Sequence, residues 1–188
     1  MSSSVAELPR VTGTCPELLT ASVRRAVRSG GSWQETADRV VAALRGRLPE
    51  SGLLSAEQLA GHPSGYQTHL VHAEPDGSFS IVVMVWLPGQ RTPVHDHLTW
   101  CVTAVLQGTE YEEIFRLAPA APLDGGAHLR SVARNANRVG TVSGFAPPGD
   151  IHQVTNIGDE VAVSMHVYGT DITRVGSSVR RVYDLPVR

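Results

Sequence analysis

Lysine is absent from this sequence, since all 16 basic residues are arginine. Its absence excludes chemistry that depends on a lysine amine, such as Schiff-base formation. There are only two cysteines, Cys15 and Cys101, and their surroundings differ, so no disulfide framework is expected. Instead the chain is rich in Ala, Val, Gly and Arg, which is typical of a GC-rich bacterial genome.

Strong charge and long apolar runs are also missing. The formal net charge is -2, with no basic stripe for nucleic acid and no polybasic run for a membrane surface. No apolar run approaches the roughly 18 residues that a membrane-spanning helix needs. The first ten residues lack the charged start and apolar segment of a signal peptide. We therefore expect a cytoplasmic protein, monomeric or a small homo-oligomer, with no nucleic-acid or membrane partner.

Two kinds of pattern divide the chain. Apolar residues recur at helical spacing over 16–28 and 32–48, and a short third helix is expected near 55–61. Ser32 and Glu35 stand at the positions of a capping box. From residue 62 onward, short runs with period-2 alternation lie between turn residues, which predicts a β-sandwich or barrel. These runs are 66–74, 78–87, 100–107, 110–118, 128–135, 138–147, 152–157 and 162–169.

The length of 188 residues favours a single domain, 1–188. Within it we expect a helical N-terminal extension over 16–61 and a β-barrel with a C-terminal tail over 62–188. The helices carry no candidate catalytic residue and are expected to pack outside the barrel.

His95 and His97 flank Asp96 on a predicted strand. Side chains two positions apart share a face of a strand, so the two imidazoles point the same way and Asp96 points the other way. Neighbouring imidazoles are suitable metal ligands. His152, which follows a Pro-Pro-Gly turn, is the best candidate for a third ligand. We predict a metal site formed by His95, His97 and His152.

Three polar residues alternate on the run 162–169, namely Ser164, His166 and Tyr168. If they face the barrel interior, they should form a hydrogen-bonded relay, because unpaired buried polar groups are costly. The other face of the run carries Val163, Met165 and Val167. The alternative that remains open is that these apolar residues face the interior and the three polar residues face solvent. Glu110 and Glu112 also share a face, which we expect to be outward.

Two motifs resemble the pair that defines cupins. The first runs from Gly89 to Gly108 and contains the two neighbouring histidines. The second is formed by Pro147, Gly149, His152 and Asn156. Ordinary metal cupins have a glutamate a few residues after the histidine pair, whereas residues 98–101 here contain no carboxylate. The resemblance implies a mainly β fold, a cupin double-stranded β-helix (jelly-roll barrel) with two or three N-terminal α-helices packed outside.

The three histidines followed by Ser164, His166 and Tyr168 resemble the cysteine dioxygenase family of thiol dioxygenases. This resemblance implies that the histidines hold Fe(II) and that both atoms of O2 are added to a small-molecule thiol, giving a sulfinic acid. Tyr168 would hydrogen-bond the substrate and oxygen, with His166 and Ser164 fixing its hydroxyl. Cys101 lies where animal-type members carry a cysteine that is cross-linked to this tyrosine. A small buried hydrophobe is the alternative role for Cys101.

The same resemblance bears on the substrate. Cysteine dioxygenases pair the substrate carboxylate with an arginine two residues after a strand tyrosine, and aligning Tyr66 with that tyrosine puts Thr68 in the arginine position. Threonine cannot make the bidentate pair that arginine makes. Relatives that use mercaptopropionate take the carboxylate with an arginine beyond the Ser-His-Tyr strand, which points to Arg181 or Arg174. The expected substrate is a mercapto acid such as 3-mercaptopropionate, or cysteine.

Two other classes of function remain open at this stage. One is another metal-dependent cupin enzyme that acts on a carbon substrate, although such enzymes usually retain the glutamate. The other is a non-catalytic metal-binding cupin, such as a sensor.

Overall fold

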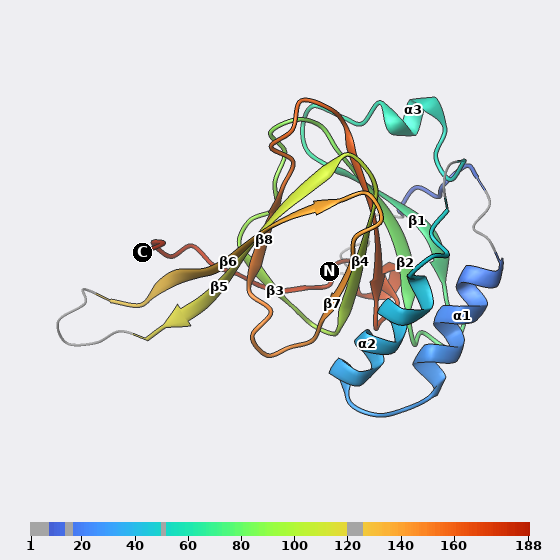
Figure 1. Ribbon diagram of the computed structural model, residues 1–188, viewed down its shortest axis with the longest axis horizontal. Helices are drawn as coiled ribbons and strands as arrows, with labels where there is room; N and C mark the ends of the chain where they lie inside the picture. Colours follow the sequence, from blue (N-terminus) through green and yellow to red (C-terminus); the bar gives the residue numbers. More distant parts are fainter. Residues whose placement is uncertain (1–7, 14–16, 50–51, 120–125) are drawn as a thin grey trace, which may run out of the picture.

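Two five-stranded antiparallel sheets form the body of the protein in the computed structural model, which describes residues 8–13, 17–49, 52–119 and 126–188 (Figure 1). The first sheet has the order β1 (Gln67–Ala73), β2 (Ser80–Trp86), β9 (Ala162–Tyr168), β4 (Cys101–Gln107) and β7 (Val142–Phe145). The second has the order β10 (Val179–Val182), β3 (His95–His97), β8 (His152–Thr155), β5 (Thr109–Ala118) and β6 (His128–Arg138). This is the expected jelly-roll architecture.

Strand β9 shows which face of the first sheet packs against the helices and which face points to the barrel interior. All seven of its residues are buried. Val163, Met165 and Val167 belong to the apolar core that includes helix residues such as Val40 and Leu44. The opposite face therefore points to the interior of the barrel, which excludes the alternative of an outward Ser-His-Tyr face.

Helices α1 (Glu17–Arg28) and α2 (Trp33–Leu44) cover the outer face of this first sheet (Figure 1). The capping box of Ser32 and Glu35 is present at the start of α2. Helix α2 ends earlier than the pattern suggested, because Arg45 leaves the helical region and Gly46 adopts a positive φ of 70°. The third helix is a single turn, α3 (Ala56–Leu59), with its own capping box from Ser55 and Gln58.

The C-terminal segment, expected as a tail, contains a strand that pairs with the second sheet. After the short helix α4 (Ile172–Val175), strand β10 pairs antiparallel with β3 and completes the second sheet. Asp96 points away from the two histidines, as expected, and its carboxylate accepts hydrogen bonds from Arg180 and Tyr183. Backbone pairing and these side-chain hydrogen bonds therefore hold β10 against β3, the strand that carries His95 and His97.

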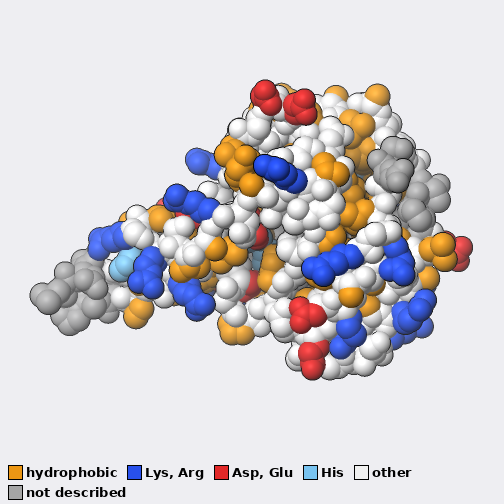
Figure 2. All heavy atoms as spheres, in the orientation of Figure 1, with side chains coloured by type: hydrophobic (Ala, Val, Ile, Leu, Met, Phe, Trp, Pro, Cys, Tyr) orange, Lys and Arg blue, Asp and Glu red, His pale blue; other side chains and the backbone are white. Residues whose placement is uncertain are grey.

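Among the described residues, no helix has both the length and the apolar character needed to cross a membrane. On the face shown in Figure 2, basic side chains are spread over the projecting β5–β6 arm and the body and do not gather in one stripe. Cys15 lies outside the described residues, and Cys101 is a buried free thiol.

Candidate metal centre and its cavity

The three predicted ligands meet in the interior. One ligand atom from each of His95, His97 and His152 lies within 4.8 Å of the others, and all three residues are buried. His95 and His152 are direct partners in the pairing of β3 with β8. His97 shares the face of His95 because it lies two residues further along β3. The second sheet thus supplies the whole cluster.

Each imidazole is oriented by a contact at its Nδ1 atom. His97 Nδ1 lies 3.1 Å from Asp150 Oδ2, and His152 Nδ1 lies 2.7 Å from Glu112 Oε1. His95 Nδ1 lies 3.0 Å from the carbonyl oxygen of Pro93. An Nδ1–H donated to an oxygen leaves Nε2 as a free lone pair, which is the usual arrangement of a metal-binding histidine.

Burial and charge keep this cluster in the form that a metal requires. Burial and the neighbouring imidazoles lower the pKa of His95 to about 3, and burial also lowers the pKa of His97. Burial alone would raise the pKa of Glu112, but the hydrogen bond with His152 holds it below its ordinary value. Neutral imidazoles with carboxylate partners fit a divalent metal ion.

The inward position of Glu112 corrects the sequence-based expectation, which placed Glu110 and Glu112 on an outward face. Both glutamates point inward from β5, since Glu112 reaches His152 and only 3% of Glu110 is exposed. Burial raises the pKa of Glu110 to about 7, and a contact with Ser164 counteracts part of that rise. Its Oε1 atom has no hydrogen-bond partner among the described residues.

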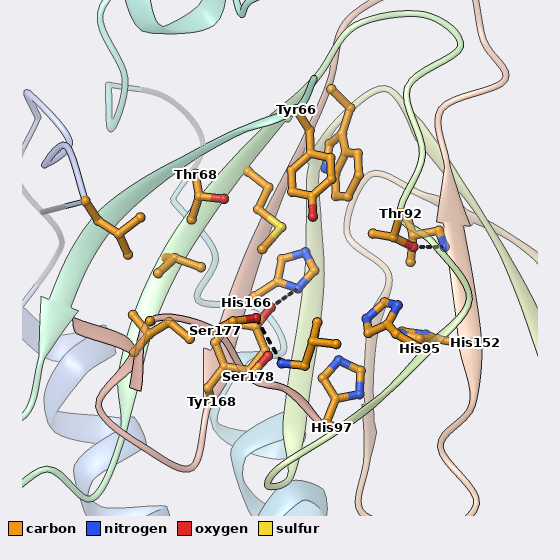
Figure 3. Close-up of a pocket in the computed structure, with 18 of the residues that line it drawn as sticks. Tyr66, Thr68, Thr92, His95, His97, His152, His166, Tyr168, Ser177 and Ser178 are labelled. Carbon is orange, nitrogen blue, oxygen red and sulfur yellow. Dashed lines mark hydrogen bonds between the residues drawn. The ribbon is translucent and has the colours of Figure 1, made fainter. Parts of the chain in front are cut away.

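A cavity of about 190 Å³ opens beside the cluster, between the two sheets. Figure 3 shows the three histidines on one side and Tyr66, Thr68, His166 and Tyr168 facing them. Ser177, Ser178 and Val179 close the cavity from the C-terminal segment. The volume lies below the roughly 300–1,000 Å³ of pockets for drug-sized ligands, so the cavity suits a small molecule.

The Ser-His-Tyr residues form a continuous hydrogen-bonded row. The Tyr168 hydroxyl lies 3.3 Å from His166 Nδ1, and His166 Nε2 lies 2.8 Å from Ser164 Oγ. Trp86 Nε1 donates to the same Ser164 oxygen at 3.1 Å. Burial lowers the pKa of His166 to about 3 and raises that of Tyr168 well above its ordinary value. Both groups are therefore neutral near neutral pH.

Cys101 is the direct partner of Tyr168 in the pairing of β4 with β9. The two residues lie in the same buried cluster, with Leu70, Val82 and Ile172. Burial raises the pKa of the Cys101 thiol well above its ordinary value. This neighbourhood is compatible with a cross-link and with a small buried hydrophobe.

The structure separates the four residues expected to contact substrate. Tyr66 and Thr68 line the cavity, whereas Arg174 and Arg181 do not. Arg174 is 65% exposed and pairs with Asp171. Arg181 is exposed on β10, with its guanidinium 5.6 Å from the centre of the Tyr183 ring. The two arginines expected at the substrate therefore lie outside the cavity, Arg174 on α4 beside Asp171 and Arg181 exposed on β10.

A jelly-roll barrel with three interior histidines defines a metal-binding cupin. Residues 60–177, more than half of the chain, match the family of cysteine dioxygenase type I. The chain belongs to this family.

Solved structures with a similar fold include oxalate oxidase in complex with glycolate, at 21% identity over 58% of this chain, with a TM-score of 0.42. The match spans 53% of that oxidase chain, about half its length. A cupin protein from Desulfovibrio desulfuricans is 21% identical over 65% of this chain and 98% of its own, with a TM-score of 0.44. The Mn(II)-containing oxalate decarboxylase of Bacillus subtilis is 20% identical over 58% of this chain and 27% of its own, with a TM-score of 0.42. These scores are low, and the family assignment rests on the match over residues 60–177.

Proposed function

We propose that this protein is a non-haem Fe(II) thiol dioxygenase that converts a small thiol into its sulfinic acid. The observation that carries the proposal is the three-histidine cluster facing the Tyr168, His166 and Ser164 row across one small cavity. One thiol and one O2 together contain all the atoms of one sulfinic acid, so the reaction requires no further reductant.

His95, His97 and His152 would hold the iron through their Nε2 atoms. Iron(II), when bound, supplies the positive charge that favours a thiolate and the site at which dioxygen is activated. Three neutral imidazoles bring no negative charge into direct contact with the metal, whereas a carboxylate ligand would. A thiolate sulfur would then be the one anionic group bound directly to the metal.

The residues opposite the cluster would position the reactants. A neutral His166 with its proton on Nδ1 would donate to the Tyr168 oxygen, and its Nε2 would accept from the Ser164 hydroxyl, which leaves the phenol proton available to the cavity. Trp86 and Ser164 fix the ring of His166, and the ring fixes the phenol. Because burial keeps Tyr168 neutral, its hydroxyl remains a hydrogen-bond donor at the cavity over the whole neutral range of pH.

Oxygen uptake with a panel of thiols tests the proposal. The iron-loaded protein is given cysteine, mercaptopropionate, mercaptopropanamide, cysteamine or mercaptosuccinate in an oxygen electrode, and the products are identified by mass spectrometry. We expect uptake that requires both iron and a thiol, with a sulfinic acid as product. Uptake that is absent or independent of thiol would favour a different metal cupin enzyme or a non-catalytic metal-binding cupin.

Replacing Tyr168 tests the role of the row. We expect Tyr168→Phe to lower kcat by about 10²–10⁴-fold, the usual contribution of a positioned proton donor, with iron content unchanged. The matched control is Tyr111→Phe, because the Tyr111 side chain is exposed on the barrel surface. A loss of less than about threefold would contradict the assigned role. The intact mass of the wild-type protein decides the state of Cys101, since a cross-link to Tyr168 removes two hydrogen atoms.

A further inference from the structure

The cavity contains no guanidinium or ammonium group from the described residues. The sequence has no lysine, and all 16 arginines lie within the described part of the chain, yet none is among the residues that line the cavity. The guanidinium of Arg180 is already paired with Asp96 on the outer side of β3. A carboxylate bound in this cavity would have no cationic side chain as a partner.

The metal centre does not remove this difficulty. Two carboxylates, the buried Asp150 and the partly buried Glu112, already contact His97 and His152. They offset the two positive charges of a divalent ion, and a bound thiolate adds a further negative charge. A second anionic group on the substrate would then be buried and unpaired, which is strongly unfavourable at low dielectric.

The wall opposite the metal cluster presents neutral hydrogen-bonding groups. The hydroxyls of Tyr66 and Thr68 point toward the cavity in Figure 3, and neither has a hydrogen-bond partner among the described residues. Burial raises the pKa of Tyr66, so its hydroxyl stays protonated near neutral pH. The apolar residues of this wall include Val82, Met84 and Ile172.

We propose that the substrate is a small thiol whose other end carries an uncharged polar group, such as a carboxamide or a hydroxyl, and that Thr68 and Tyr66 recognise this group. The proposal rests on the thiol dioxygenase function proposed above. It replaces the mercapto acid and cysteine that the sequence suggested, because the structure brings no arginine to the cavity.

A pair of thiols of equal length separates the two substrate classes. Mercaptopropanamide and mercaptopropionate differ only in the charge of the end group. We expect kcat/KM for oxygen uptake to be at least about tenfold higher for the amide, because the acid leaves a buried charge unpaired. Binding is measured independently of turnover from the thiolate absorption of the cobalt(II)-loaded protein, and we expect Kd to favour the amide by a similar factor.

Variants at Thr68 test the recognising group. We expect Thr68→Val to weaken binding of the amide severalfold and to leave the acid unchanged, and Thr68→Arg to reverse the preference toward the acid. The matched controls are Thr155→Val and Thr155→Arg, because Thr155 lies on β8 one residue beyond the inward Val154 and lines the outer surface. Cobalt content and circular dichroism report whether each variant folds, and if Thr68→Arg does not fold, Thr68→Val decides.

The outcomes distinguish the two proposals. Equal or tighter binding of the acid by the wild-type protein would overturn the inference about the end group and leave the dioxygenase function intact. Oxidation of none of the thiols, amide and acid included, would overturn the dioxygenase function itself.

Discussion

Glu112 holds His152 in place although the two residues are 40 positions apart in the sequence. The pairing of β5 with β8 brings them together, with Ile114 opposite His152. The period-2 pattern of β5 correctly placed Glu110 and Glu112 on one face but could not say which face. The charge of the two glutamates favoured the solvent-facing side. Only the pairing of β5 with β8 shows that this face lies beside His152. The three histidines do converge, as their type and spacing predicted, and their role as metal ligands stays a prediction.

We expect Glu112→Gln to weaken metal binding by about 10–100-fold, the usual cost of removing the partner of a metal-binding histidine. The measurement is a titration of the metal-free protein with iron(II) or cobalt(II) in competition with a chelator. Glu113→Gln is the control, because Glu113 is the next residue on β5 and pairs with the exposed Arg134. Equal affinities of the two variants would contradict the role of Glu112.

Glu110 should make stability depend on pH. Its pKa is raised from 4.5 to about 7, so between these values the folded protein keeps a proton that the unfolded chain has lost. The stability that this proton contributes is present below pH 4.5 and is lost as the pH rises through about 7. We expect the free energy of unfolding of wild type, relative to Glu110→Gln, to fall by about 3 kcal/mol between roughly pH 5 and pH 8. Urea unfolding of the metal-free proteins at both pH values measures it, and parallel behaviour of the two would refute the prediction.

At the scale of the elements, helix α1 is attached to the first sheet by a buried carboxylate as well as by apolar contacts. Glu74, which directly follows β1, is 4% exposed and accepts hydrogen bonds from Arg24 of α1 at 2.6 and 3.0 Å. His72 Nε2 lies 2.8 Å from the same carboxylate. The helix pattern predicted where α1 lies in the sequence and that it packs outside, but it gave no sign of this ion pair.

Glu74→Ala should therefore destabilise the protein by about 2 kcal/mol, the usual worth of hydrogen bonds to a charged group. A double-mutant cycle with Arg24→Ala, measured by urea unfolding, should give a coupling energy of at least about 1 kcal/mol. The control is Arg25→Ala, since Arg25 is exposed on the same helix. Additive effects of the two substitutions would show that the pair contributes only as separate residues.

Strand β10 is a strand that the sequence did not predict. Its residues, Val179–Val182, place two arginines between two valines and are mostly exposed, so they lack the alternation of a half-buried strand. They adopt the strand because β3 offers a free edge and Asp96 binds Arg180. Arg180 therefore stabilises the sheet through its contact with Asp96. The residues that line the cavity are Ser177 and Ser178, which precede β10.

For the whole molecule, the two motifs predicted the jelly-roll barrel, and the match over residues 60–177 confirms the family. Those motifs consist of turn residues and ligands at fixed offsets, which a single sequence displays directly. The character of the cavity could not be predicted in the same way. It depends on which residues of several strands converge, and on where each arginine side chain points once the sheets are paired.

Metal binding should stabilise the folded protein as a whole, because the ligand set comes from strands that are distant in sequence. At a free metal concentration about 100 times Kd, linkage adds about 2.7 kcal/mol. For a chain of this size, a chelator should then lower Tm by about 5–10 °C in a thermal-unfolding scan. A His95→Ala variant should lose this response, and an equal shift in that variant would show that the metal binds elsewhere.

The attachment of β10 to β3 also bears on how the protein is made. The chain supplies its metal ligands by residue 152, whereas the strand that braces β3 spans Val179–Val182. During vectorial synthesis, the three histidines therefore leave the ribosome before the segment that closes the cavity around them. A nascent chain can therefore bring its three histidines together before the segment that closes one side of the cavity has been made.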